Sequence, residues 1–451
     1  MWNYKEVYGI VILYYFGGYV MGLKIGYARV DITPEAPVPL AGLGNTLSRI
    51  SDNSLDRLQS TCLACTGADG ETVLLFTSDL IRGVPSILDR ARAAIQEKYG
   101  IAPERIMFSN THTHSATDYT QQEHEGVLQA VEMMIRRVTE AAGQALADRA
   151  PATLLAGSSR PKTLNFVRHY LRDPETNALV GHPYEPDNQL QLVKIKREGA
   201  KDILIMNWQA HPCFTSGYNK HDISADYVHT FREMIEGETG MLFAFFLGAS
   251  GDVNARSRIK EEVIAPDRDT YAELMRKYIA EALENLVPLE GETVKILRRV
   301  IKLTIDHSDD HRIDDAQIVV DFWKKTYDRK ATDAMAKPYG INSPYHAGAI
   351  IGRSKQPAYI EMPIDAACIG GLGFAFAPYE MFCKNGMFIK ENSPFAATVV
   401  ATCSNNAYSY LADDFAFTAQ CYEVDVRRFE RGTAEKVAAE FVSVLGELKN
   451  A

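Results

Sequence analysis

Apolar side chains recur along this chain at two different spacings. Within residues 85–99, Leu88, Ala91 and Ile95 lie three or four positions apart, which places them on one face of a helix. Pro85 suits the first turn of that helix, and Gly100 suits its end. Helical spacing, with Ser224 as a capping residue in one case, predicts further helices over 127–146, 224–235, 268–286, 313–327 and 433–448.

Short runs of consecutive apolar residues predict strands. Two of these runs, 190–196 and 203–208, flank a turn at Glu198-Gly199. In the middle of the chain, such runs alternate with amphipathic helices. This alternation predicts an α/β fold in which a layered mixed sheet has flanking helices.

Five apolar runs end abruptly in polar or reactive side chains. In chain order they lead into residues 110–114, 211, 251–254, 378–380 and 404–410. In α/β proteins, the loops beyond the carboxyl ends of the strands form the binding crevice. We therefore expect an active site at the C-terminal ends of the strands. We also expect a single catalytic domain over 22–451, because a cut between these segments would divide the site.

Composition narrows the function. With 451 residues, 46% of them hydrophobic, the chain can bury a large core. A net charge of −10 argues against a nucleic-acid partner, and the lack of a Lys/Arg run argues against a polybasic membrane patch. The seven cysteines are irregularly spaced, which fits free thiols and a cytoplasmic location. We interpret the isolated pair Cys62 and Cys65 as two strand residues.

The first 21 residues differ from the rest of the chain. Their apolar run, 10–16, is shorter than the ~20 residues that span a bilayer, and no small-residue cleavage site follows it. Met21 then begins a stretch that reads as a natural start. We interpret 1–21 as an N-terminal extension that need not be native, with a short peripheral anchor as the alternative. We expect no stable membrane insertion.

The polar segments contain the elements of a metal site. His112 and His114 lie two positions apart, so in an extended segment both imidazoles face the same side. One of the two could bind a metal while the other stays free for proton transfer. Together with His211 and Glu380, the metal-binding one gives a candidate His/His/Glu site, which is typical of catalytic zinc with one position open for water. Taken singly, each has a plainer interpretation: His211 as a structural histidine, Glu380 as a solvated loop carboxylate.

Seven short motifs, taken in order, resemble the catalytic domain of the neutral (non-lysosomal) ceramidase family. They are spread over residues 22 to 432 and read IGYARVDITPEAPVPLAGLG, FSNTHTHSATDY, LNFVRHYLRDP, MNWQAHP, GDVN, APYE and SNNAYSYLADDFAFTAQCYEV. The resemblance implies zinc as the cofactor. It places the four zinc ligands on His112, His211, Glu380 and Tyr410.

The same resemblance bears on four other residues and implies roles for three of them. His114 would transfer a proton or bind substrate, Arg168 would bind the polar part of the substrate, and Tyr422 would stabilise the reacting carbonyl oxygen. Asn254 stands where the family has a serine, so the amide cannot act as an oxygen nucleophile. Ala116-Thr117 replaces the family's Gly-Pro. The family's C-terminal immunoglobulin-like domain and a secretion signal are not apparent, and we expect a shortened, bacterial-type relative.

These features predict a zinc-dependent hydrolase that cleaves an amide (N-acyl) bond by attack of metal-bound water. The alternatives are a zinc hydrolase of an ester, a lactone or a carbohydrate derivative, and a non-catalytic metal-binding relative. The expected partner is a small-molecule substrate. Asp79, at the end of an apolar run, would either orient a ligand histidine or serve a turn, and the charged run 306–311 is interpreted as a solvated loop.

Overall fold

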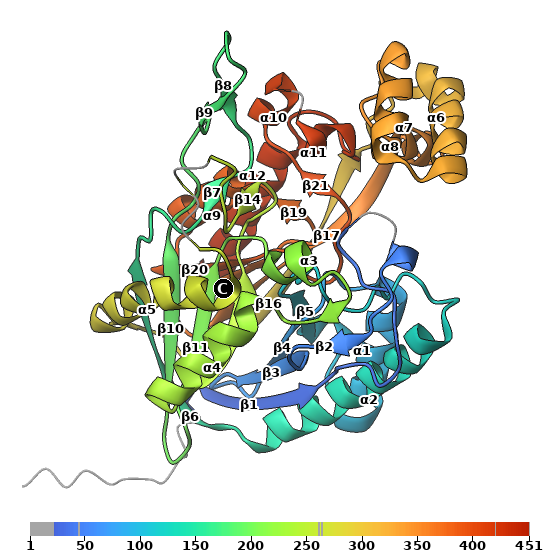
Figure 1. Ribbon diagram of the computed structural model, residues 1–451. Helices are drawn as coiled ribbons and strands as arrows, with labels where there is room; N and C mark the ends of the chain where they lie inside the picture. The colour runs from blue at the N-terminus through green and yellow to red at the C-terminus, as the bar shows by residue number, and fades with distance from the viewer. Residues whose placement is uncertain (1–21, 44–45, 260–261, 263–264, 420, 451) are drawn as a thin grey trace, which may run out of the picture.

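The computed structural model describes residues 22–43, 46–259, 262, 265–419 and 421–450. The predicted extension over 1–21 lies outside the described residues. A nine-stranded mixed sheet forms the larger part of the molecule (Figure 1). Its strands run in the order β13 (Leu242–Leu247), β11 (Ile203–Trp208), β10 (Leu190–Arg197), β6 (Ala150–Ser159), β1 (Lys24–Asp31), β3 (Gln59–Thr66), β4 (Thr72–Ser78) and β5 (Ile106–Asn110), with β15 (Val287–Leu289) beside β6.

The pairing within this sheet explains where its polar loops meet. The central strands β10, β6, β1 and β3 are antiparallel to their neighbours, whereas β11 with β13 and β4 with β5 are parallel. Parallel neighbours end at the same edge of a sheet. The loops that follow β11 and β13 therefore lie at the same edge. The loop that follows β5 meets the loop after β11 directly, since the His114 N–H donates to the Pro212 carbonyl at 3.1 Å.

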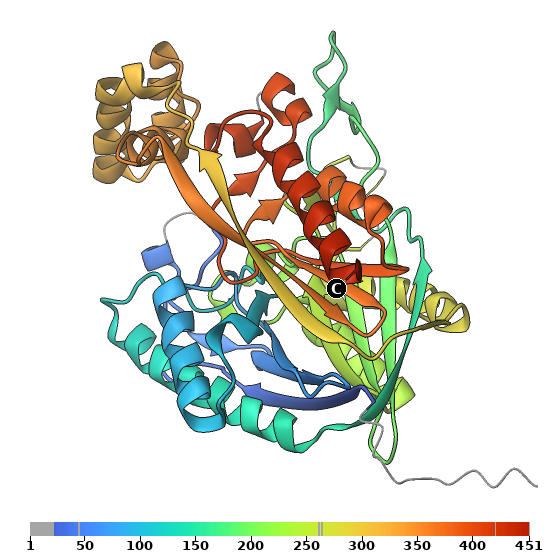
Figure 2. The same cartoon turned by 180° about the vertical axis from the view of Figure 1, so that it is seen from behind.

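A second, four-stranded sheet packs face to face against the first. Its order is β16 (Val294–Thr304), β17 (Tyr359–Ile369), β18 (Leu372–Phe376) and β20 (Ala397–Ala401). One buried cluster joins the two sheets, and in it the rings of Phe246 and Phe374 lie 5.6 Å apart. The view from behind shows the long β16–β17 pair crossing the molecule (Figure 2).

Helices cover the outer face of each sheet, so the architecture has four layers. On the first sheet, α1 (Pro85–Tyr99) and α2 (Glu125–Ala147) cover the part that contains β1, β3, β4 and β5, and α4 (Tyr227–Thr239) and α5 (Arg268–Glu284) cover the part that contains β10, β11 and β13. The second sheet is covered by α9 (Cys383–Asn392) and α12 (Thr433–Asn450). The predicted α/β class, with a layered mixed sheet and flanking helices, is confirmed. Among the described residues, no helix has both the length and the apolar composition needed to cross a membrane.

The remaining elements among the described residues are short. The strands are β2 (Asn53–Ser54), β7 (Phe166–Val167), β8 (Leu171–Arg172), β9 (Leu179–Gly181), β12 (Asp222–Ile223), β14 (Val253–Asn254), β19 (Glu380–Met381) and β21 (Tyr410–Leu411). The helices are α3 (Phe214–Tyr218), α10 (Asp414–Ala419) and α11 (Tyr422–Asp425), with 3₁₀ turns at Thr46–Ser48, Pro103–Arg105, Asp310–Arg312 and Lys337–Tyr339.

Two sequence interpretations agree or nearly agree with the structure. Cys62 and Cys65 are buried free thiols on β3, and they face different cores, so the pair consists of two strand residues as expected. The predicted helix after Ser224 exists, but its cap is Asp226, whose side chain accepts from the Tyr227 N–H. The prediction of Ser224 as the cap was wrong because both residue types cap helices and only the backbone decides between them.

A small helical insert separates β16 from β17. It consists of α6 (Ile313–Thr326), α7 (Arg329–Ala336) and α8 (Pro344–Ser354), which project from one end of the molecule (Figure 1). The segment 306–311 leads into this insert, and the interpretation of a solvated loop was wrong at two positions. Asp306 and Asp309 are only 6% and 8% exposed, and both form ion pairs with Arg427.

Candidate metal centre and its surroundings

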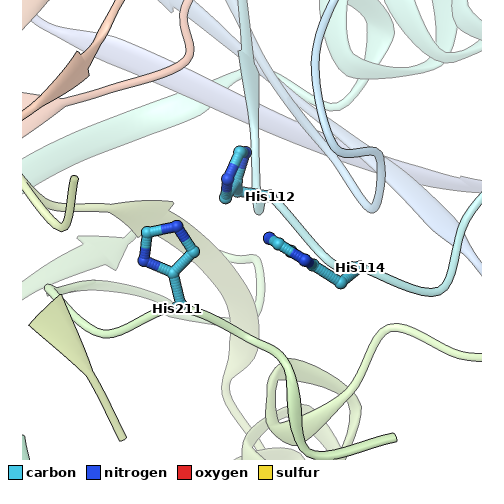
Figure 3. Close-up of side chains that lie close together, drawn as sticks. All are labelled: His112, His114 and His211. Atoms are coloured by element: carbon cyan, nitrogen blue, oxygen red, sulfur yellow. The ribbon is translucent and has the colours of Figure 1, made fainter. Parts of the chain in front are cut away.

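Three histidines from two separate loops point toward a common centre (Figure 3). His112 and His114 follow β5, and His211 follows β11. Their ring centroids lie 5.0 Å to 5.4 Å apart. His112 has a φ of 65°, a left-handed conformation that costs a non-glycine residue ~1–2 kcal/mol and is often found where a site requires it.

Glu380 brings a carboxylate to two of these rings. Its Oε2 lies 3.4 Å from His112 Nε2 and 3.5 Å from His211 Nε2. Glu380 also pairs with Tyr410 in the parallel ladder of β19 and β21, which places the two side by side. The four residues predicted as ligands therefore lie together, although they are spread over nearly 300 residues of sequence.

The atoms of this cluster fit a tetrahedral zinc ion. With Zn–N and Zn–O bonds of about 2.0–2.1 Å, two ligand atoms lie about 3.3 Å apart. The two N···O separations at Glu380 are close to that value. His211 Nε2 and Glu380 Oε2 are buried and have no hydrogen-bond partner among the described residues. A cation between them would satisfy both atoms, whose burial is otherwise costly.

Backbone carbonyls fix the orientation of both histidines. His112 Nδ1 lies 2.7 Å from the carbonyl oxygen of Ile81, and His211 Nδ1 lies 3.0 Å from that of Val253. A carbonyl can only accept, so each Nδ1 carries the proton and each Nε2 keeps its lone pair for a metal. Asp79 does not orient a histidine. It forms an ion pair with Arg232 and accepts from the Gln59 N–H.

The charges of the cluster follow from its burial. Burial alone would raise the pKa of Glu380, but His112 and His211 lower that pKa well below its ordinary value, so the carboxylate is ionised. Burial, together with His112 and His211, lowers the pKa of His114 well below its ordinary value. His114 is therefore a neutral imidazole near pH 7, and neither of its ring nitrogens has a hydrogen-bond partner among the described residues.

Arg168 lies beside the cluster and is held from three directions. Its backbone N–H donates to the Asp252 carbonyl at 2.8 Å, and its guanidinium lies 5.2 Å from the centroid of the Tyr410 ring. The guanidinium also forms an ion pair with Glu423, 2.6 Å away. Burial would raise the pKa of Glu423, but Arg168 and His169 lower it to about 2. Arg168 is thus kept in place by an ionised carboxylate.

Sequence reasoning missed Glu423 and His169, whose Nε2 lies 3.0 Å from a Glu423 oxygen. One signal was available, since a buried arginine requires an anionic partner and Glu423 directly follows the predicted site residue Tyr422.

The Tyr422 ring is 46% exposed and lies 6.2 Å from the Tyr410 ring. The backbone of Asn254 forms a bridge with His211, so this position also adjoins the cluster.

Comparison with solved structures identifies the class of fold. The fold of the chain is similar to that of two solved ceramidase structures. It is similar to the neutral ceramidase from Pseudomonas aeruginosa with a TM-score of 0.68 and 18% identity, over 95% of this chain and 75% of that one. A ceramidase complexed with C2 matches with a TM-score of 0.68 and 17% identity, over 95% and 76% of the two chains.

The resemblance predicted from the seven motifs is therefore confirmed at the level of the fold. No protein-family model matches the chain, and no curated protein sequence matches it.

Proposed function

We propose that the protein is a zinc-dependent hydrolase of an amide (N-acyl) bond. The observation that carries the proposal is the cluster of His112, His211 and Glu380, whose facing atoms lie at separations suited to one tetrahedral ion. Among the described residues, His211 Nε2 and Glu380 Oε2 have no hydrogen-bond partner. Tyr410, beside Glu380 in the ladder, completes the proposed ligand set. A bound zinc ion supplies Lewis-acid chemistry, because it polarises a carbonyl group and lowers the pKa of water to about 7.

The neighbouring side chains provide the remaining chemistry. His114 is neutral near pH 7, so its imidazole can accept a proton from the attacking water and pass it to the leaving nitrogen. Such proton transfer contributes roughly 10²–10⁴-fold to a rate. The Tyr422 hydroxyl can donate to the carbonyl oxygen as negative charge develops on it, and one such donor contributes ~3 kcal/mol. The nitrogens of the three histidines lie within 4.8 Å, so His114 is also close enough to serve as a nitrogen ligand.

Substrate has room beside Arg168 and Tyr422. A cavity of about 820 Å³ is lined by Arg168, His169, Leu171, Tyr422 and Phe415, among other residues. Its wall combines a fixed guanidinium with apolar side chains. This combination suits an acyl compound that has a polar or anionic group near the bond to be cleaved.

One observation favours a second candidate within the same chemistry. At Asn254, next to His211, this chain has an amide where a serine was expected from the family resemblance. The asparagine amide has a separate donor and acceptor, at a different distance from the backbone than the serine hydroxyl. Its contacts with a substrate therefore differ from those of serine. An ester, a lactone or a polar carbohydrate derivative is therefore the alternative substrate, and ceramide need not be accepted.

The proposal is tested by hydrolysis assays with matched fluorogenic N-acyl amides, esters and lactones. We expect the amides to be cleaved, the activity to be lost on chelation, and zinc to restore it. His114→Ala should retain zinc and lose most turnover. A protein that holds zinc but cleaves none of the compounds would support the non-catalytic alternative, and preferential cleavage of esters or lactones would support the second candidate.

A further inference from the structure

A second group of metal-binding side chains lies beside the proposed active site. Among the described residues, His169, Cys421 and Glu423 each offer one ligand atom, and these three atoms lie within 4.8 Å of one another. His169 follows β7, Cys421 is the cap of α11, and Glu423 lies in the first turn of that helix. Glu423 already holds Arg168 through an ion pair, but the four proposed zinc ligands and the roles of His114, Tyr422 and Asn254 use none of these three side chains.

The distances within this group resemble those of a metal site. His169 Nε2 lies 3.0 Å from Glu423 Oε2 in a hydrogen bond, and the two atoms need to separate only slightly to reach the ~3.3 Å between two ligand atoms on one zinc ion. The side chain of His169 is 10% exposed, and its Nδ1 is buried with no hydrogen-bond partner among the described residues. Arg168 contacts the other carboxylate oxygen, Oε1, so Oε2 is left to the histidine.

The ligand types indicate which ion would bind. A thiolate, an imidazole and a carboxylate together favour a thiophilic divalent ion such as zinc over magnesium or calcium, which require oxygen ligands. All three residues line the cavity of about 820 Å³, so an ion can reach them and a fourth position can face solvent. The Arg168 charge opposes a second cation, and we therefore expect this site to bind more weakly than the histidine cluster.

We propose that His169, Cys421 and Glu423 form a second, weaker site for a thiophilic divalent cation at the wall of the substrate cavity. The proposal does not depend on hydrolytic activity. A metal can bind these three side chains whether or not the neighbouring cluster catalyses a reaction. Its failure and the failure of the proposed function can therefore be told apart by measuring metal binding alone.

The test uses cobalt as a spectroscopic probe on the full-length, metal-depleted protein. The histidine cluster has no thiol among its proposed ligands, so a sulfur-to-cobalt charge-transfer band in the near ultraviolet reports the second site. We expect the band in the unmodified protein and in Cys213→Ser, which removes the other partly exposed thiol. We expect Cys421→Ser to lose both the band and the weaker binding event while keeping the tighter one.

Two results would overturn the proposal. One is that Cys421→Ser keeps both the charge-transfer band and the number of cobalt ions bound per chain. The other is loss of the band in Cys403→Ser instead, because the Cys403 sulfur lies 3.4 Å from His112 Nδ1 and is the competing thiol.

A labelling experiment covers the case in which Cys421→Ser does not fold. Unmodified protein is treated with iodoacetamide with and without zinc, and alkylation of Cys421 is followed by peptide mass spectrometry. At a zinc concentration ten times the dissociation constant of the weaker site, we expect alkylation to slow by about tenfold. An unchanged rate of alkylation at that concentration contradicts the second site.

Discussion

Replacing Gly42 with alanine tests the position of His114 without changing His114 itself. Gly42 has a φ of +105°, and the Ala41 N–H donates to the Ala116 carbonyl at 2.9 Å, which holds this loop against the histidine loop. A Cβ at position 42 would lie 2.6 Å from Cγ and 2.7 Å from Cβ and Nδ1 of His114. The added methyl group therefore occupies the place of the His114 side chain.

The size of the effect follows from these distances. Carbon atoms in ordinary contact lie about 3.5–4.0 Å apart, so the His114 ring must move by about 1 Å. A displacement of about 1 Å can reduce a rate about 10²-fold, within the range expected for loss of a proton-transfer group. The left-handed conformation adds a cost of ~1–2 kcal/mol in stability for any residue with a Cβ.

The assay compares Gly42→Ala with Gly100→Ala. Gly100 has a φ of +71°, but a Cβ there would meet nothing within 4 Å, so this control has the backbone cost without the contact. We expect both variants to lose free energy of unfolding in urea, Gly42→Ala by ~1–3 kcal/mol more because of the contact, and a fall of about 10²-fold in kcat/KM for Gly42→Ala alone. Combining Gly42→Ala with His114→Ala should lower turnover no further than His114→Ala. Full turnover in Gly42→Ala, with its stability reduced, would refute the role of His114.

Three further predictions concern other parts of the molecule. Asp79→Asn should lower the free energy of unfolding by ~3–5 kcal/mol, because the substitution leaves the buried Arg232 without its anionic partner. Urea denaturation measures this loss, and a loss under ~1 kcal/mol would contradict the prediction. Burial lowers the pKa of His346 to about 4 from 6.5. The unfolded chain therefore binds more protons than the folded chain between these pH values. The free energy of unfolding should fall by ~1–2 kcal/mol as the pH drops from 6.5 to 4, and it should fall less in His346→Asn. The same change in melting temperature for the parent protein and His346→Asn across this pH range would contradict the prediction. Tyr422→Phe should lower kcat by about 10²-fold because the hydroxyl donor is lost, whereas Tyr327→Phe on the helical insert should leave kcat unchanged. Equal kcat values for the two variants would show that the Tyr422 hydroxyl takes no part in the reaction.

Local sequence patterns predicted much of the fold, and the reason is physical. Helical spacing is set within a few turns, so the helices α1, α2, α5, α6 and α12 agree closely with their predicted ranges. The pairing of β16 with β17 is different, because the insert of α6 to α8 separates the two strands. Such pairing depends on contacts between distant residues, and the local pattern holds no information about them.

The same distinction applies to the charged residues. Asp306 looked solvated because its neighbours in sequence are polar, yet its partner Arg427 lies 121 residues further along the chain. Glu423 and Arg168 are separated by 255 residues, and only the fold brings them together. By contrast, the proximity of His112, His211 and Glu380 was predictable, because each follows an apolar run that forms a strand, and the loops beyond strand ends commonly line one crevice.

The central claim is that one ion is shared by side chains from distant loops, and metal content measures this directly. Elemental analysis would be carried out on freshly purified protein in the Cys421→Ser background, so that the proposed second site does not contribute. The account predicts about one zinc ion per chain, lost in His211→Ala and in Glu380→Gln and kept in the folded control Gly100→Ala. If both ligand variants fold and retain the same zinc content as the parent, these residues do not hold the ion and the account is contradicted.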